Sequence, residues 1–217
     1  MMTSTRLKTI AKHIEPYKKI ADVGCDHGYL ILEAFENHNI EFAQAIDNKS
    51  QPLKNALKNI TQEGLSSKVI FTLGEGLENL WEEVEVVIIS GMGGFNIIKI
   101  LSNNQNKEIK RFILQANRNV YNLREFLMEN NYRIVDEDIV DEGEKYYEII
   151  VCEFTNEKQV YSEDELKFGP VLLRKRSPVF INKLKHERDK LTVIDMKVDA
   201  IEEKIRRLDE IICWQKK

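Results

Sequence analysis

Residues 20–30, with the sequence IADVGCDHGYL, limit the possible folds of this chain more than any other segment. A short apolar run leads through an acidic residue into a glycine turn and then into the start of an apolar helix. A strand, a glycine turn and a helix in this order are typical of the first unit of a parallel sheet that holds a nucleotide-like cofactor at the turn. The segment therefore predicts an α/β fold with a ligand site at the end of its first strand.

Strand and helix patterns alternate along most of the chain. Apolar runs predict strands at residues 19–23, 41–46, 68–73, 84–90 and 111–114, and helices at 28–37, 50–63, 77–81, 95–101 and 120–130. An amphipathic helix with Leu7, Ile10, Ala11 and Ile14 at helical spacing precedes the first strand and ends before Pro16. This alternation predicts a parallel sheet with helices on both faces.

The last two predicted strands, residues 132–139 and 146–154, have no helix between them. We therefore expect an antiparallel hairpin at one edge of the sheet. A seven-stranded, mostly parallel sheet with its last strand antiparallel resembles the class I, Rossmann-like methyltransferase architecture. We assign residues 1–160 to this domain.

Residues 161–217 are expected to form a helical extension. Apolar residues recur there at heptad-like spacing: Leu184, Leu191, Ile194, Val198, Ile201, Ile205, Leu208 and Ile212. A single helix cannot shield such a stripe from water, so we predict two helices packed as an antiparallel coiled coil, with the turn within residues 190–198. One long helix that packs on another molecule is the alternative.

Charge is distributed unevenly between these two parts. From Val171 to Lys217 there are 13 Lys and Arg and 8 Asp and Glu, a net charge of +5, whereas residues 1–170 carry −9. A basic extension supplies phosphate contacts without making the whole chain basic, and a solvated helical face is the alternative. The candidate contacts are Arg174, Lys175, Arg176 and Lys183.

Several classes of protein are disfavoured. No apolar run approaches the ~20 residues that cross a bilayer, and the first residues lack the apolar core of a signal peptide, so we expect a cytoplasmic protein without membrane segments. The three cysteines, Cys25, Cys152 and Cys213, are widely separated. This spacing argues against a disulfide framework, and no metal site is expected.

Polar residues and glycines gather where the predicted strands end, at the edge where open parallel sheets bind ligands. The candidate cofactor residues are Asp22, Gly24, Cys25, Asp26, His27, Gly28, Asp47, Asn48, Gly74, Glu75, Gly76, Ser90 and Gly91. The candidate substrate residues at this edge are His27, Gly93, Gly94, Gln115 and Asn117. Five such groups on one edge predict a single site.

Asp26 stands where the usual methyltransferase fingerprint has a third glycine. A carboxylate there repels a pyrophosphate but suits the sulfonium and ammonium groups of S-adenosylmethionine, which we predict as the cofactor. Asp47 lies 23 residues after Gly24, close to the ~20-residue interval at which an acid binds ribose hydroxyls. A strand-end turn is its alternative role, and Glu75 lies either beside the adenine of the cofactor or in an exposed turn.

Gly91-Met92-Gly93-Gly94 follows the fourth parallel strand, where nucleic-acid amino methyltransferases often carry an aromatic Pro-Pro motif. Glycines there let a flat substrate approach the backbone, so Gly91 and Met92 join Asp26 as candidate catalytic residues; a packing turn is the alternative. The amides of Gln115 and Asn117 are able to read a base edge.

The motifs DVGCDHGYL (22–30), GEGL (74–77), GMGG (91–94), LQAN (114–117), REFL (124–127), YYE (146–148) and GP (169–170), with Arg6-Leu7, resemble the bacterial TrmK family. These are tRNA adenine-N1 methyltransferases that act on adenine 22. Family members tend to have alanine at Gly28, aspartate at Glu75 and proline at Ala116. The resemblance implies S-adenosylmethionine as cofactor, tRNA as partner and Arg6 as a substrate contact over the site.

The implied reaction needs little base catalysis, because adenine N1 already carries a lone pair. We expect positioning to dominate, with Asp26 either stabilising the cationic product or only binding the cofactor ammonium. The target base pairs in the D arm and must be exposed or flipped. A monomer is expected. The rival classes are a small-molecule methyltransferase and a non-catalytic tRNA-binding protein.

Overall fold

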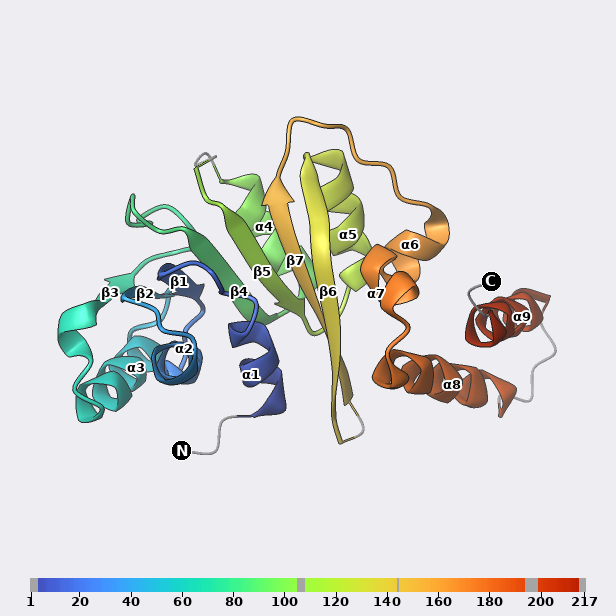
Figure 1. Cartoon of the computed structure of the whole chain (residues 1–217), viewed down its shortest axis with the longest axis horizontal. Helices are drawn as coiled ribbons and strands as arrows, with labels where there is room; N and C mark the ends of the chain where they lie inside the picture. The colour runs from blue at the N-terminus through green and yellow to red at the C-terminus, as the bar shows by residue number, and fades with distance from the viewer. Residues whose placement is uncertain (1–3, 105–107, 144, 194–198, 215–217) are drawn as a thin grey trace.

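The computed structural model describes residues 4–104, 108–143, 145–193 and 199–214, and its sheet has the order β3-β2-β1-β4-β5-β7-β6 (Figure 1). The strands are β1 (Lys19–Val23), β2 (Phe42–Asp47), β3 (Val69–Leu73), β4 (Val86–Met92), β5 (Arg111–Ala116), β6 (Tyr132–Glu142) and β7 (Lys145–Phe154). Strands β1 to β5 pair in parallel, and β7 is antiparallel to both β5 and β6. The predicted mixed α/β sheet with an antiparallel hairpin at its edge is confirmed.

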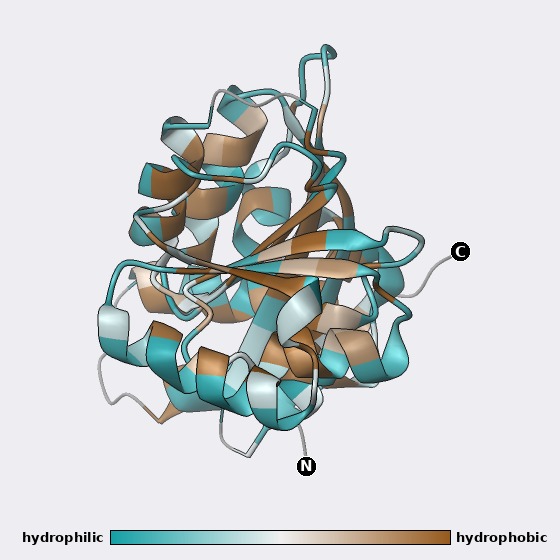
Figure 2. Cartoon of the chain, turned by 90° about the vertical axis from the view of Figure 1, so that its left-hand side faces the viewer, coloured by the Kyte–Doolittle hydropathy of each residue, from teal (hydrophilic) through white to brown (hydrophobic). Residues whose placement is uncertain are grey.

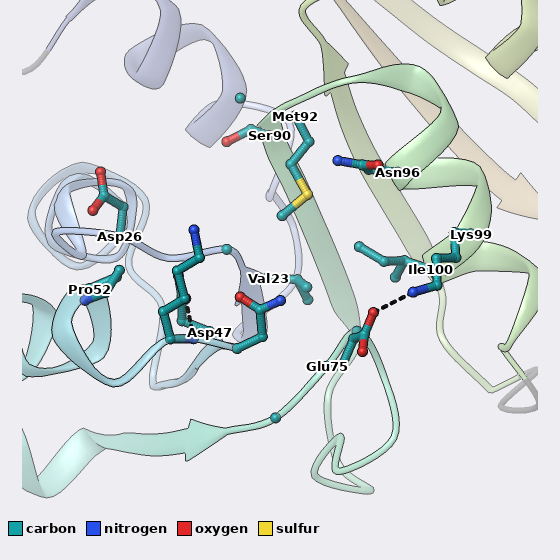
Figure 3. Close-up of a pocket in the computed structure, with 16 residues that line it drawn as sticks. Val23, Asp26, Asp47, Pro52, Glu75, Ser90, Met92, Asn96, Lys99 and Ile100 are labelled. Carbon is teal, nitrogen blue, oxygen red and sulfur yellow. Dashed lines mark hydrogen bonds and ion pairs between the residues drawn. The ribbon is translucent and has the colours of Figure 1, made fainter.

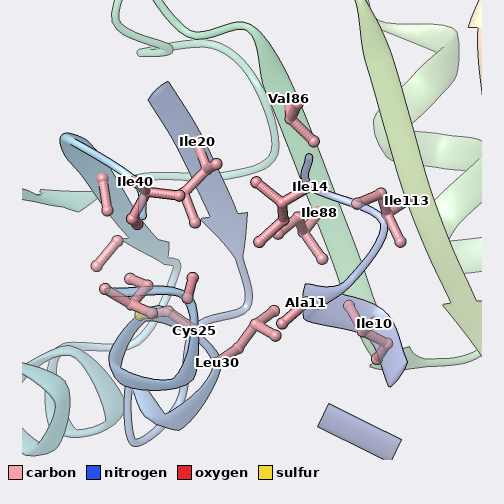
Figure 4. Close-up of a cluster of buried hydrophobic side chains, with 14 of the residues drawn as sticks. Ile10, Ala11, Ile14, Ile20, Cys25, Leu30, Ile40, Val86, Ile88 and Ile113 are labelled. Atoms are coloured by element: carbon pink, nitrogen blue, oxygen red, sulfur yellow. The ribbon is translucent and has the colours of Figure 1, made fainter. Parts of the chain in front are cut away.

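Helices cover both faces of this sheet. They are α1 (Thr5–Ala11), α2 (Tyr29–Asn37), α3 (Ser50–Gln62), α4 (Gly94–Ser102) and α5 (Val120–Glu129), with a 3₁₀ turn, η1, at Ser66–Lys68. Ile10 of α1, Ile31 of α2 and Ile60 of α3 belong to one apolar core (Figure 4), and Ile97 of α4 and Leu123 of α5 belong to the other. Figure 2 shows the hydrophobic colouring of the central strands between these two layers.

The central strands are apolar on both sides because both of their faces are covered. Val86, Val87, Ile88 and Ile89 of β4 are all fully buried, as expected for a parallel strand between two helical layers. Ser4 caps the start of α1, and its hydroxyl accepts a hydrogen bond from the Leu7 backbone N–H at 3.3 Å. This cap fixes the start of a helix that packs beside α2 and β6.

Two local predictions are wrong. Residues 77–79 form a turn and residues 80–81 are irregular, so the predicted helix is absent. The Gln44 amide donates to the Asn79 carbonyl and accepts from the Trp81 N–H, both at 2.8 Å. These bonds occupy backbone groups that a helix would use. Strand β4 also continues through Gly91 and Met92 instead of ending at Ser90, with an irregular register between Ser90 and Met92 where Gly91 has φ of 76°.

Four helices follow β7 in the described residues: α6 (Glu163–Phe168), α7 (Pro170–Lys175), α8 (Pro178–Thr192) and α9 (Asp199–Cys213). The short helices α6 and α7 are not part of the predicted stripe. Ion pairs join α8 to α9, from Glu187 to Lys204 at 3.1 Å and from Arg188 to Asp209 at 3.3 Å. These pairs exclude one straight helix. Residues 194–198 of the predicted turn lie outside the described residues.

A buried ionic cluster joins these helices to the sheet. Arg124 of α5 contacts Glu137 of β6 at 2.8 Å and Glu148 of β7 at 2.5 Å, and the Lys183 ammonium of α8 pairs with Glu148. The other Glu137 oxygen accepts the Val171 N–H at 2.8 Å, at the start of α7. We call Arg124, Glu137, Glu148 and Lys183 the anchor cluster.

The turn between α6 and α7 requires a glycine. Gly169 has φ of +93°, and a Cβ there would lie 2.6 Å from a Glu137 oxygen and 2.7 Å from an Arg124 nitrogen. Any side chain at this position would therefore collide with the anchor cluster.

Strand β6 also holds the N-terminal helix. Asp138 pairs with Lys12 at 2.5 Å and with His13 at 2.9 Å, and Glu142 accepts the Arg6 backbone N–H at 2.8 Å. Within the described residues, no helix combines the length and apolar character needed to cross a membrane.

Candidate active site

Two cavities lie side by side at the carboxyl ends of β1 and β4. The first, about 390 Å³, is lined by the loops after β1, β2 and β3 and by one face of α4 (Figure 3). The second, about 400 Å³, lies beneath Arg6 and Leu7 of α1. Gly24, Asp26, Ser90 and Gly91 line both cavities. A ligand in each cavity would therefore meet the other at these four residues.

The loop after β1 is held close to β2 and β4. The N–H groups of Gly24 and Cys25 both donate to the Ile46 carbonyl, at 2.8 and 3.1 Å. Gly24 has φ of +81°, and a Cβ there would lie 2.3 Å from the Met92 Cε atom. The Met92 side chain is flexible and can move aside, so it is the positive φ that favours glycine at this position.

Asp26 adopts the left-handed backbone conformation, with φ of 45°. This is the conformation that glycine adopts most easily and that aspartate tolerates at some cost. Its side chain is 67% exposed, with an oxygen 3.6 Å from the His27 Nε2 atom. An aspartate thus stands where the usual fingerprint has glycine, at a position with glycine-like backbone.

Three carboxylates line the two cavities: Asp47 lines the first, Asp22 lines the second, and Asp26 lines both. Burial, with the nearby charges of Asp47 and Asp26, raises the pKa of Asp22 to about 7. Asp47 is buried and accepts the Lys49 backbone N–H at 2.9 Å. Within the described residues neither Asp22 nor Asp47 has a basic ion-pair partner. We call these three residues the acidic trio, and their uncompensated charge favours a cationic ligand.

The opposite wall of the first cavity comes from the loop after β3 and from α4. Glu75 pairs with Lys99 at 2.6 Å across the cavity rim (Figure 3), and this hydrogen bond lowers the Glu75 pKa. Gly74, Glu75, Gly76, Asn48 and Met92, all predicted from the sequence, line this cavity. Its volume falls in the range of about 300–1,000 Å³ that is usual for small-molecule sites.

Arg6 covers the second cavity. Its guanidinium donates to the Gln115 oxygen at 3.2 Å and lies 4.8 Å from the centre of the Tyr147 ring. The Arg6 Nε atom is buried without a hydrogen-bond partner in the described protein. Glu142 therefore holds the backbone of Arg6, and Tyr147 and Gln115 hold its side chain, over this cavity.

The two amides expected to read a base are partly occupied within the protein. The Gln115 oxygen also accepts the Gly91 N–H at 3.2 Å, and the Asn117 amide donates to the Gly91 carbonyl at 2.7 Å. Gln115 is fully buried and lines neither cavity, whereas Asn117 lines the second. Gln115 thus links Arg6 and Asn117 to the Gly91 backbone.

The remaining residues of the loop after β1 have distinct positions. The His27 ring stacks on Tyr29, with centroids 5.4 Å apart, in the second cavity. Cys25 is buried, and burial raises its pKa far above the usual range, which disfavours a thiolate nucleophile. Gly28 packs against α3, where a Cβ would lie 3.0 Å from Ile60 Cδ1. The described residues contain no group of three or more side chains suited to a metal ion.

Gly93 and Gly94 lie outside both cavities. Gly94 is buried, its N–H donates to the Arg118 carbonyl at 2.9 Å, and a Cβ there would lie 2.4 Å from the Asn119 carbonyl oxygen. These glycines bring α4 close to the loop before α5, as in the packing alternative.

The four basic residues predicted to contact phosphate differ in their surroundings. Lys183 belongs to the anchor cluster, and Lys175 pairs with Asp136 at 2.6 Å. Arg174 is exposed without an ion-pair partner in the described part of the chain. The Arg176 guanidinium lies 5.4 Å from the centre of the Trp214 ring.

Sequence reasoning missed several residues of the two cavities. Asn96, Lys99 and Ile100 line the first cavity, and their spacing on α4 places them on one helical face, a signal that the sequence contains. Pro52 and Lys49 also line it, and Tyr29 lines the second.

Comparison with known proteins places this geometry in a family. The sequence profile described as "TrmK: tRNA (adenine(22)-N(1))-methyltransferase" matches residues 20–216. A tRNA (adenine(22)-N(1))-methyltransferase of Bacillus subtilis (strain 168) is 34% identical over 191 residues, which cover 85% of this chain and 80% of that protein.

Solved structures agree with the sequence match. Sp1610 of Streptococcus pneumoniae, in complex with S-adenosyl-L-methionine, has a TM-score of 0.88 and 34% identity, over 97% of this chain and 100% of that one. TrmK of M. capricolum, in complex with S-adenosyl-homocysteine, has a TM-score of 0.80 and 31% identity, over 97% and 96% of the two chains.

Proposed function

The chain belongs to the TrmK family of tRNA (adenine(22)-N(1))-methyltransferases, and from this premise we propose how its own residues carry out the reaction. It transfers a methyl group from S-adenosylmethionine to N1 of adenine 22 in tRNA. The observation that carries the proposal is the pair of cavities that share Gly24, Asp26, Ser90 and Gly91. One holds the cofactor and the other holds the target base.

The first cavity fits a cationic cofactor because Asp26 and Asp47 line it and Asp22 lines the adjoining second cavity. When bound, S-adenosylmethionine supplies an electrophilic methyl group on a positively charged sulfur. Asp47 binds the ribose hydroxyls, and Asp22 and Asp26 neutralise the positive charge of the cofactor. Asn48, Gly74, Glu75 and Gly76 surround its adenosine moiety.

The second cavity takes adenine 22 after the base has left the D-arm stack. Asn117 and the Gly91 backbone contact the base, His27 lies against it, and Arg6 covers it from α1. N1 approaches the shared residues, so the reacting atoms are aligned there without a general base. Asp26 lines both cavities and stabilises the positive charge that develops on the methylated base.

The helices after residue 160 form the tRNA-binding extension. Residues 1–160 make up the S-adenosylmethionine-binding domain, and α8 and α9 of residues 161–217 pack as an antiparallel coiled coil. The ion pairs between these helices and the net charge of +5 from Val171 onward support this division. The enzyme acts as a cytoplasmic monomer.

The activity is tested by incubating the protein with labelled S-adenosylmethionine and unmodified tRNA, followed by mapping of the modified base. We expect label at N1 of adenine 22, and a tRNA with guanine at position 22 is the matched control. Equal labelling of both tRNAs, or label only in small molecules, would contradict the proposal.

The role of Asp26 is tested by two variants that suit its left-handed backbone. Asp26→Asn removes the charge, and Asp26→Gly also relieves the backbone conformation. We expect both to lower the single-turnover methyl-transfer rate at saturating cofactor by about 100-fold. If cofactor affinity collapses while the saturated rate is unchanged, Asp26 only binds the cofactor.

A further inference from the structure

A third cavity, of about 480 Å³, lies between α6, α7 and α9, away from the two cavities of the candidate active site. Three arginines and one tryptophan line it, Arg174, Arg176, Arg207 and Trp214, together with Glu165 and Glu210. Strands β4 and β6 are three strand spacings apart in the sheet, about 15 Å, and this cavity lies beyond β6. A ligand bound in this cavity would therefore contact the protein at a second place, separate from the candidate active site.

Trp214 presents its ring at the surface of this cavity. The side chain is 54% exposed even though the Arg176 guanidinium lies 5.4 Å from its ring centre. Its backbone N–H donates to the Glu210 carbonyl at 3.0 Å, which fixes the residue to the end of α9. An exposed indole beside an arginine is a surface on which a planar base stacks.

Arg176 has unused hydrogen-bonding capacity. Its Nη2 atom donates to the Ile212 carbonyl at 3.1 Å, whereas its Nη1 atom is buried without a partner in the described protein. A buried guanidinium N–H without an acceptor is costly. Because this atom is buried, the Arg176 side chain must turn toward the cavity before a phosphate or carbonyl oxygen bound there satisfies it.

The charged side chains of the cavity fall into two groups, those paired within the protein and those without an ion-pair partner in the described residues. Arg207 pairs with Asp164 and with Glu210, at 2.7 Å to the latter, and Glu165 accepts the Ser162 N–H at 2.8 Å in the cap of α6. These acids are engaged within the protein. Arg174 is exposed without an ion-pair partner in the described chain, so Arg174 and Arg176 remain available to an anion.

We propose that the α7–α9 cavity binds one unpaired nucleotide of tRNA, with the base stacked on Trp214 and the phosphate contacted by Arg174 and Arg176. A nucleotide in a duplex has both faces of its base covered, so only an unpaired or flipped-out base stacks on the indole. This inference rests on the proposed function only for the identity of the RNA.

The test compares Trp214→Ala with Trp214→Phe, which keeps an aromatic ring. The dissociation constant for fluorescently labelled unmodified tRNA is measured with saturating S-adenosylhomocysteine. We expect Trp214→Ala to weaken tRNA binding about 10-fold and Trp214→Phe to retain most of the affinity. The affinity for S-adenosylhomocysteine and the thermal midpoint should stay at wild-type values.

A second pair of variants tests the phosphate contact. Arg174→Ala and Arg206→Ala each remove one exposed positive charge from the extension, but Arg206 does not line the cavity. Only Arg174→Ala should reduce the slope of log affinity against log salt concentration by about 1. In a Trp81→Phe background, tRNA should also quench the remaining tryptophan fluorescence.

Wild-type tRNA affinity in Trp214→Ala, with equal salt slopes for the two arginine variants, would overturn the inference. The same holds if Trp214→Ala alters self-association in sedimentation experiments while tRNA affinity stays the same. These results are distinguishable from a failure of the proposed function. If the proposed function is wrong, the wild-type protein does not methylate adenine 22, regardless of how tightly the variants bind tRNA.

Discussion

The molecule contains two sets of carboxylates, each with buried members, whose surroundings are opposite. In the acidic trio, Asp22 and Asp47 lie at the carboxyl ends of β1 and β2 without a basic partner in the described residues, and the Asp22 pKa rises to about 7 because of burial. In the anchor cluster, Glu148 is equally buried, but Lys183 and Arg124 hold its pKa down to about 2. Burial alone therefore does not decide the charge state.

The presence or absence of a basic partner distinguishes a structural ion-pair cluster from a ligand-binding site. A buried acid with its own cation holds two parts of the protein together, and removing the cation leaves an unpaired charge. Buried acids without a cation, at the wall of a cavity, are left for a positively charged ligand. Changing the charge balance of either set tests this distinction, and the exposed pair of Glu75 and Lys99, outside both sets, serves as the reference.

The largest expected effect comes from Arg124→Met in the anchor cluster. Loss of the guanidinium leaves Glu137 without its cation in the core, and such losses cost about 3–5 kcal/mol. For a chain of this length we expect the thermal midpoint to fall by roughly 10 °C, measured by differential scanning calorimetry. Arg206→Ala, at an exposed position on α9, should change it little. Equal midpoints for the two variants would contradict the structural role.

In the acidic trio, Asp22→Asn should have opposite effects on stability and binding. The apo protein should become more stable at pH 8, because a desolvated charge is removed. Affinity for S-adenosylmethionine should fall at least 10-fold. Calorimetry of unfolding and of binding on the same samples measures both changes. Joint loss of stability and affinity would show that Asp22 is a structural group.

Cofactor affinity should depend on pH through Asp22. A cation binds best to the ionised carboxylate, so affinity should rise about 10-fold from pH 6 to pH 8, level off above a pKa of about 7, and lose this dependence in Asp22→Asn. The same measurement of cofactor affinity against pH in Asp22→Asn is the control. A flat wild-type profile would mean that a different group balances the cofactor charge.

The stability of the apo protein should respond to pH with opposite signs at the two sets. Asp22 holds a proton in the folded state that the unfolded chain loses near pH 4, so its contribution falls as pH rises from about 4 to 7. Glu148 contributes stability above its unfolded pKa of 4.5 that is lost as pH falls towards 2. Urea titrations of wild type, Asp22→Asn and Glu148→Gln from pH 3 to 8 separate the two contributions. Parallel profiles for all three proteins would contradict this assignment.

The smallest effect is expected at the exposed pair of Glu75 and Lys99. Surface ion pairs add little to stability, so Lys99→Ala should shift the thermal midpoint by no more than about 1 °C. A shift as large as that of Arg124→Met would mean that exposure does not distinguish the pairs of this molecule.

Much of the fold was predictable because its signals are local. The bounds of β1, residues 19–23, and of α3, near residues 50–62, follow from apolar runs ended by glycine, proline or capping residues. The candidate site was predictable because parallel strands bring their carboxyl ends to one edge, so that Asp26, Asp47, Glu75 and Gly91 meet without neighbouring in sequence.

The features that were not predicted depend on contacts between residues far apart in the sequence, which no local pattern reveals. Arg124 and Glu148 look like ordinary surface charges in sequence, yet they are buried because each partner comes from another element. Lys175 and Lys183 looked available to phosphate for the same reason. The helix predicted at residues 77–81 is absent, and Gln44, on a distant strand, occupies backbone groups there.

Strand β6 contacts both the N-terminal helix α1 and the helix α7. Glu142 and Asp138 hold α1 with its Arg6, and Asp136 and Glu137 hold α7. The six steps from Asp136 to Glu142 span about 20 Å of continuous strand, and no hinge interrupts them within the sheet. One continuous strand therefore fixes the spacing between α1 and α7. A substitution that breaks β6 between Asp136 and Glu142 would displace the two helices relative to one another.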